Sequence, residues 1–262
     1  MAVVTFLAIQ LISSVIMIAT VAIMGVNMSI YKSTALGIAL IIANLLSTLV
    51  CWKGLKLINI PATFDASKNK WRWSLIAILA SIFGVFAGDL LSEQMDLSNI
   101  IADQIVDLAH NTWGILVIAL IGPIAEELIF REGICGHLLR NGDNPWKAIW
   151  ISAVLFGLIH LNPAQIPFAV LMGVILGVIY VKTGNIVVTS IIHVLNNSFA
   201  VSQVWMLGDN VMDFRMADWM GGNAVAGVCI ILGFAICFYL LRRFWEEYTT
   251  IETNALGEYD KG

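Results

Sequence analysis

Charge is scarce in this chain of 262 residues, because only 12% of them are Asp, Glu, Lys or Arg, against roughly a quarter in an ordinary soluble domain. The net charge is −4 and no long basic or acidic run occurs, which excludes the electrostatic pattern typical of nucleic-acid binding. The four cysteines show neither a CxxC pair nor zinc-finger spacing. Neither a disulfide framework nor a cysteine metal site is therefore indicated.

Apolar residues make up 59% of the chain, and the mean hydropathy is +0.87. A water-soluble core of this size cannot hide so much apolar surface, so the composition predicts an all-α, polytopic membrane protein. A membrane-spanning helix needs about 20 mainly apolar residues. About eight such helices are predicted, at 3–26, 33–52, 73–91, 112–138, 146–161, 165–182, 185–207 and 222–241. The first lacks the basic region of a signal peptide and is interpreted as a helix.

Orientation follows from the short loops, because loops rich in Lys and Arg face the cytoplasm. Bases follow the second predicted span, at Lys53, Lys56, Lys68, Lys70 and Arg72. Acids follow the third, at Asp89, Glu93, Asp96, Asp103 and Asp107. This pattern places both termini in the cytoplasm and favours a bacterial plasma membrane. The amphipathic segment 92–111 is too acidic to span and predicts a short helix at the outer surface.

Ionisable and amide side chains inside apolar spans are functional candidates, since charge in hydrocarbon is costly. They gather in the fourth, fifth and seventh predicted helices, at Glu126, Glu127, Arg131, His160, His193 and Asn197. Residues four apart share a helix face, which predicts an ion pair between Glu127 and Arg131. By the same spacing Phe156 lies over His160, and His193 over Asn197.

Adjacent helix positions differ by about 100° in direction. We therefore expect Glu126 and Glu127 to have different partners, with Glu126 facing the bundle interior. Gly122 and Pro123 just before them should loosen or kink the helix. A carboxylate in a partly dry cavity is a competent general base for water. Amide hydrolysis would then need no serine or cysteine nucleophile.

The remaining polar residues suit the same chemistry. His160 can orient the water or shuttle its proton, while His193 and Asn197 supply two hydrogen-bond donors on one face, as an oxyanion hole requires. One difficulty is depth, because His160 ends a short helix and should lie nearer the outer face than Glu126. Either that helix starts deeper, or the cavity is slanted, or the predicted boundary is wrong.

Structural explanations compete with these roles. The acids could reach lipid headgroups at a helix end, Arg131 could be a structural charge, and His193 with Asn197 could serve only interhelical hydrogen bonding. Gly173 and Gly177 form a GxxxG pattern that close helix packing explains. Zinc is a less favoured alternative, since no HExxH occurs and an amide is a poor zinc ligand. We predict no cofactor and no metal.

Three motifs in order, EExxxR at Glu126, FxxxH at Phe156 and HxxxN at His193, resemble those of the CPBP family. This family comprises the CAAX prenyl proteases of the second type and the bacterial bacteriocin-processing and self-immunity (Abi) proteins. The resemblance covers roughly residues 112–200. It implies an intramembrane glutamic endopeptidase with a water-filled catalytic cavity. It further implies catalytic roles for Glu126, His160, His193 and Asn197, with Glu127, Arg131 and Phe156 in support.

The sequence thus divides into a three-helix membrane region with its amphipathic segment (1–111), a catalytic helical core (112–207), and a last span with a polar cytoplasmic tail (208–262). The predicted partners are the lipid bilayer and a peptide or protein that enters the cavity. The predicted substrate is a small peptide precursor or a prenylated, CAAX-like chain. Two alternatives stay open: a non-proteolytic bacteriocin immunity or regulatory protein on the same scaffold, and a proton-coupled transporter, although the two halves show no inverted repeat.

Overall fold

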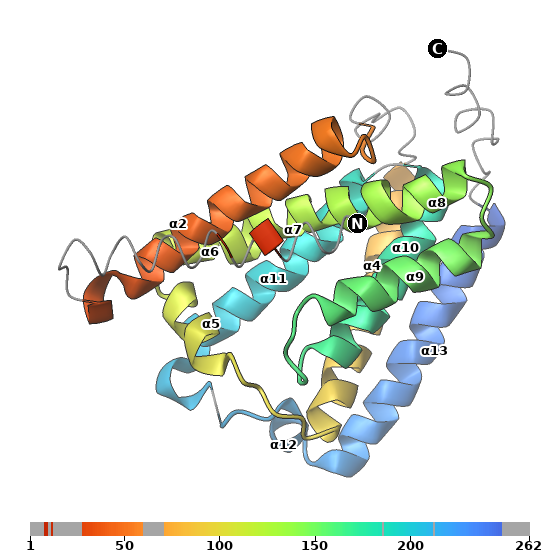
Figure 1. The fold of residues 1–262 in the computed structure, drawn as a ribbon. Coiled ribbons are helices and arrows are strands. Elements are labelled where there is room, and N and C mark those ends of the chain that lie inside the picture. The colour runs from red at the N-terminus through yellow and green to blue at the C-terminus, as the bar shows by residue number, and fades with distance from the viewer. Residues whose placement is uncertain are drawn as a thin grey trace. The chain divides into compact units, whose positions relative to one another are not determined.

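The computed structural model describes residues 8, 9, 12, 28–59, 71–184, 186–211 and 213–247. Throughout these residues the regular structure is helical (Figure 1). The longer helices are α2 (Met28–Leu49), α4 (Trp71–Gln94), α5 (Ala102–Ala109), α9 (Pro145–Leu158), α10 (Ile166–Thr183), α11 (Val187–Leu207) and α13 (Asn223–Glu247). Shorter elements are η1 (Val50–Gly54), η5 (Gly208–Asn210) and α12 (Met216–Trp219). A further helix, Thr112–Arg140, is built from five consecutive segments.

Six helices of the described chain are long and apolar enough to cross a membrane: Lys32–Gly54, Trp71–Gln94, Thr112–Arg140, Ile166–Thr183, Val187–Leu207 and Asn223–Glu246. They confirm an integral membrane protein and match six of the predicted spans. The fifth predicted span, 146–161, ends too late, because α9 has 14 residues and stops at Leu158. The predicted first span, 3–26, and the tail beyond residue 247 lie outside the described residues, so the count of eight is not confirmed.

Contacts divide the chain into two compact units, each built from three separate stretches. The first unit consists of residues 1–56, 101–129 and 193–214. The second consists of residues 57–100, 130–192 and 215–262. The division at 111 and 207 drawn along the sequence stays a prediction.

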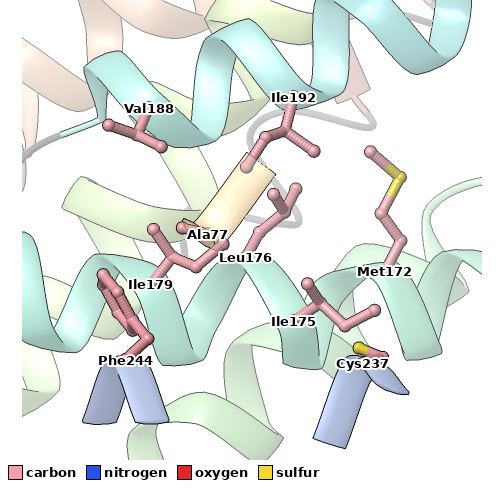
Figure 2. Packing of buried hydrophobic residues seen from close by; sticks show 9 residues of the cluster. All are labelled: Ala77, Met172, Ile175, Leu176, Ile179, Val188, Ile192, Cys237 and Phe244. Atoms are coloured by element: carbon pink, nitrogen blue, oxygen red, sulfur yellow. The ribbon is translucent and has the colours of Figure 1, made fainter. Parts of the chain in front are cut away.

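In the first unit, α5 is the short amphipathic helix predicted within 92–111. Asn111 follows it and caps the next helix, its side-chain oxygen accepting from the backbone N–H groups of Trp113 and Gly114. Ala109 packs against Val201 and Val204 of α11. The second unit contains a larger apolar cluster, in which residues of α4, α10, α11 and α13 point toward one another (Figure 2).

Glycines bring the helices of the second unit close together. A Cβ atom on Gly173 of α10 would lie 2.8 Å from the Ala153 Cα of α9, and one on Gly177 would lie 3.1 Å from an Ile149 methyl carbon. The predicted role of the GxxxG pattern in close packing is therefore confirmed, because a larger residue at 173 would collide with backbone. This contact holds α9, the helix that precedes His160, against α10.

Candidate functional site

The helix that carries the two adjacent glutamates is not a regular α-helix. Its segments are α6 (Thr112–Leu116), η3 (Val117–Ile121), α7 (Gly122–Glu126), η4 (Glu127–Gly136) and α8 (His137–Arg140), of which η3 and η4 are π-helical. The Gly122 N–H donates to the Val117 carbonyl, five residues back. The predicted disturbance at Gly122 and Pro123 thus takes the form of widened turns, which are frequent at functional sites.

His193 lies between the two glutamates. Its Nδ1 is 3.1 Å from Glu127 Oε1, and its Nε2 is 3.7 Å from Glu126 Oε2. The Glu127 side chain is fully buried, His193 is 3% exposed and Glu126 is 19% exposed. This buried group in the first unit therefore consists of one imidazole and two carboxylates, of which only Glu126 keeps appreciable access to solvent.

The expectation that Glu126 and Glu127 have different partners is wrong. The imidazole ring is wide enough to offer one nitrogen to each acid. Glu127 also opens the π-helical segment η4, where the wider turn rotates successive residues through a smaller angle than an α-helix does. The predicted ion pair of Glu127 with Arg131 stays a prediction.

Asn197, one turn after His193 on α11, also contacts the glutamate helix. Its Nδ2 donates to the Ile118 carbonyl at 2.9 Å, and its Oδ1 accepts from Asn196 Nδ2 at 3.0 Å. A carbonyl only accepts, so this network determines which end of the amide is nitrogen. The amide nitrogen has a second N–H, the type of donor that an oxyanion hole uses.

Arg131 lies in the second unit and is fully buried. Its Nη1 donates to Ser152 Oγ at 3.4 Å, and its Cζ lies 4.7 Å from the centre of the Phe156 ring. Ser152 in turn donates to the Phe130 carbonyl at 2.7 Å. The guanidinium therefore packs against the aromatic residue of the second motif, a cation–π contact that gains strength away from water.

His160 follows the end of α9 and lies in a turn. Its ring packs edge-on against Phe156, with 5.1 Å between ring centres, which confirms that Phe156 lies over it. His160 Nδ1 is 2.9 Å from the Phe156 carbonyl. Because a carbonyl only accepts, Nδ1 must carry the proton of this bond, and Nε2 is then the nitrogen that can accept one in the neutral ring.

The turn after His160 is tied to the segment 98–100, which the sequence did not predict. Leu161 has φ of +51°, and the Asn162 beside it is fully buried. The Asn162 side chain donates from Nδ2 to Asn99 Oδ1 at 2.9 Å and accepts from the Ile100 N–H at 3.1 Å. A leucine in the left-handed conformation is strained. The two hydrogen bonds of the Asn162 amide therefore stabilise the strained loop that carries His160.

A second buried carboxylate network was also missed. Tyr180 donates to Glu132 Oε2 at 2.5 Å, and Arg140 donates to Glu132 Oε1 at 2.7 Å. Gly136 makes room for these hydrogen bonds, because a Cβ there would collide with the Tyr180 hydroxyl. A third acid directly after Arg131 in an apolar helix was the signal that could have revealed it.

The first unit thus brings Glu126, Glu127, His193 and Asn197 onto two contacting helices. The second unit brings together Arg131, Phe156 and His160. The meeting of these two groups around one water stays a prediction. Among the residues that the structure describes, no group of three or more His, Cys, Asp or Glu side chains is placed to hold a metal ion. The expectation of no cofactor also stays a prediction.

The fold and these contacts define an integral membrane protein with polar residues that meet inside apolar helices. A family model described as type II CAAX prenyl endopeptidase Rce1-like matches residues 108–199. This stretch includes all three motifs. Residues 108–199 are therefore similar to the Rce1-like CAAX prenyl endopeptidase family, which confirms the resemblance.

Curated relatives are bacterial. YdiL of Bacillus subtilis, named as a proposed membrane peptidase, is 36% identical over 87 residues, 33% of this chain and 35% of its own length. The membrane-embedded CAAX protease MroQ of Staphylococcus aureus is 37% identical over 92 residues, 33% of this chain and 37% of its own. The UPF0177 protein YxdF of Lactococcus lactis is 33% identical over 93 residues, 35% of this chain and 50% of its own.

The chain thus spans about a third to a half of the length of these relatives. No solved structure matches the chain.

Proposed function

We propose that this chain is a membrane-embedded endopeptidase that uses Glu126 to activate water. The observation that carries the proposal is the placement of His193 between Glu126 and Glu127 on helices apolar enough to span a membrane. Two carboxylates and an imidazole are costly there, and such groups are retained in membranes mainly for function. The match of residues 108–199 to a CAAX prenyl endopeptidase family supports the same reaction class.

In the first step, Glu126 would remove a proton from a water molecule while the water oxygen attacks the carbonyl carbon of the scissile peptide bond. Glu126 suits this role because it is the more exposed of the two acids. The carbonyl π electrons move onto oxygen, which becomes the oxyanion of a tetrahedral intermediate. Glu127, fully buried against His193 Nδ1, would instead hold the imidazole in place.

In the second step, Asn197 and His193 would donate hydrogen bonds to that oxyanion. Asn197 offers the Nδ2 hydrogen that Ile118 does not use. His193 in its protonated form would offer Nε2–H, since its Nδ1–H faces Glu127. The intermediate then collapses, the C–N bond breaks, and the proton held by Glu126 passes to the leaving amine.

His160 would orient the attacking water or relay its proton. Its Nδ1–H is engaged by the Phe156 carbonyl, which leaves Nε2 to accept a hydrogen bond from water. Arg131 and Phe156 would hold this histidine through the cation–π contact and the edge-on ring contact of the second unit. The reaction as written uses no metal and no cofactor.

The substrate class we propose is a small peptide precursor or a prenylated, CAAX-like chain that enters the cavity from the bilayer. MroQ is named a CAAX protease, and the matched family is described by the same substrate type. All three relatives come from bacteria, which favours a bacterial plasma membrane, with both termini in the cytoplasm as the loop charges predict.

The test uses the full chain in liposomes with two internally quenched peptides. Both end in Cys, two aliphatic residues and one further residue, and one of them is farnesylated at the Cys. We expect wild-type protein to cleave one of these peptides, and Glu126→Gln to lower the rate about a thousandfold, the size of a lost general base. Glu246→Gln, which changes an exposed acid of α13, is the matched control and should keep the wild-type rate.

Cleavage that survives Glu126→Gln would contradict the proposed mechanism, and cleavage of neither peptide by wild-type protein would contradict the CAAX-like part of the proposed substrate class. A pH-sensitive dye inside the same liposomes tests the transporter alternative. Proton entry that requires Glu126 in the absence of peptide cleavage would favour transport over proteolysis.

A further inference from the structure

We propose that Pro123 is a positioning residue for Asn197, because its missing N–H leaves the Ile118 carbonyl available to the Asn197 side chain. The inference rests on the proposed function for its catalytic purpose. It deepens that proposal by explaining how an oxyanion-hole amide is held in place.

The Ile118 carbonyl has no backbone donor at the position where a regular helix would supply one. In an α-helix this oxygen would accept from the N–H of Gly122, four residues ahead. Gly122 instead donates to Val117, five residues back, which closes the π turn of η3. Continued π bonding would pair Ile118 with the N–H of residue 123, and a proline has none.

The Asn197 side chain supplies the hydrogen bond that the helix backbone does not give to Ile118. A carbonyl that is partly buried in an apolar helix is costly without a donor, and Asn197 Nδ2 supplies the bond at 2.9 Å. Pro123 is itself buried, so water around its ring does not supply the missing hydrogen bond to Ile118. The side chain of one helix thus completes the backbone bonding of another.

The oxygen of the Asn197 amide is also held by a hydrogen bond. Asn196 Nδ2 donates to Asn197 Oδ1 at 3.0 Å, so the Asn197 amide is held at both its nitrogen and its oxygen. This restricts both the position and the flip of the group. A preorganised donor stabilises a developing oxyanion more than a mobile one, because no reorganisation is needed during the reaction.

Gly122 is a companion of Pro123 in this arrangement. A Cβ at position 122 would lie 2.6 Å from the Val117 carbonyl oxygen that accepts the π-turn bond. A side chain there would push the two backbone groups apart and favour the α-helical bond from residue 122 to Ile118. The pair Gly122-Pro123 therefore both diverts one donor from Ile118 and removes the other.

The structural test is NMR of the full chain in detergent, labelled with ¹⁵N-asparagine. The Asn197 side-chain amide signal is assigned from its loss in Asn197→Asp. We expect Pro123→Ala to shift this signal and to speed its exchange with solvent, because the new N–H competes for Ile118. Pro167→Ala, which removes a proline from the first turn of α10, is the matched control and should leave the signal unchanged.

The functional test is a double-mutant cycle on whichever quenched peptide the wild-type protein cleaves. We expect Pro123→Ala to lower kcat about tenfold, a coupling typical of residues that act on one hydrogen-bond network, with KM unchanged. In an Asn197→Ala background the same change should have no further effect. A merely structural proline would lower both backgrounds equally, and Pro167→Ala should affect neither.

An unchanged Asn197 signal in Pro123→Ala would overturn the proposal, as would equal losses of kcat in the two backgrounds. If wild-type protein cleaves neither peptide, the proposed function fails separately. The NMR comparison of Pro123→Ala with Pro167→Ala still tests whether Pro123 positions Asn197, because this measurement requires no turnover.

Discussion

The two units hold their motif histidines by different forces. In the first unit, His193 lies between the carboxylates of Glu126 and Glu127. In the second, His160 is held by a backbone carbonyl and by the edge of the Phe156 ring. The first contact depends on charge, whereas the second depends on packing and on the local backbone.

The same residue type therefore suits two different tasks, depending on its neighbours. A histidine beside carboxylates is oriented and can donate from both nitrogens when it is protonated. A histidine whose Nδ1–H is engaged by a carbonyl presents Nε2 as an acceptor, which suits a water molecule. Removing charge should therefore affect the first unit, and removing packing or loop contacts should affect the second.

Of the changes that separate the two histidine contacts, Glu127→Gln should lower activity the most. The isosteric amide keeps the volume but removes the charge that orients His193, so we expect kcat to fall about a hundredfold, as when a residue that orients a catalytic histidine is neutralised. Peptide cleavage in liposomes measures it, normalised to folded protein. A wild-type rate in Glu127→Gln would show that the contact between Glu127 and His193 does not depend on charge.

Arg131→Met should act mainly on stability. Methionine fills much of the same space but loses the cation–π contact with Phe156 and the bond to Ser152. We expect the free energy of unfolding to fall by about 2 kcal/mol, measured by SDS titration of mixed micelles. Ser152→Ala, which loses only the hydroxyl, is the control and should cost about 1 kcal/mol. Equal losses would show that the cation–π contact of Arg131 adds nothing to the free energy of unfolding.

The smallest effect is expected at the loop after His160. Asn162→Ala should lower the free energy of unfolding by about 1.5 kcal/mol, since bonds to Asn99 and Ile100 are lost. Leu161→Gly in that background should recover about 1 kcal/mol, because glycine adopts positive φ without strain. Leu161→Ala is the matched control and should recover none. Recovery by alanine would assign the effect to side-chain size rather than to the backbone.

The sequence predicted the features that depend on helical spacing. Four-residue spacing placed Phe156 over His160, and apolar run lengths located six spans. The small residues Gly173 and Gly177 predicted close packing of one helix on another. These predictions succeed because they need only the regular geometry of an α-helix.

The remaining features depend on departures from that geometry. The sharing of His193 by Glu126 and Glu127 involves a π-helical segment, which a regular period of 3.6 residues does not predict. The bonds of Asn162 join loops 63 and 62 residues apart in the chain. The carboxylate of Glu132 is satisfied in part by Tyr180, 48 residues away. Such partners follow from tertiary packing, which local patterns do not encode.

The short helix α9 has a consequence for the surrounding lipid. Its 14 residues extend about 21 Å, roughly 9 Å less than the hydrocarbon thickness of a typical bilayer. A bilayer crossed by α9 would therefore be thinner beside this helix, or polar groups at the end of the helix would lie below the headgroups. In both cases a membrane of longer acyl chains would impose a larger elastic cost beside α9.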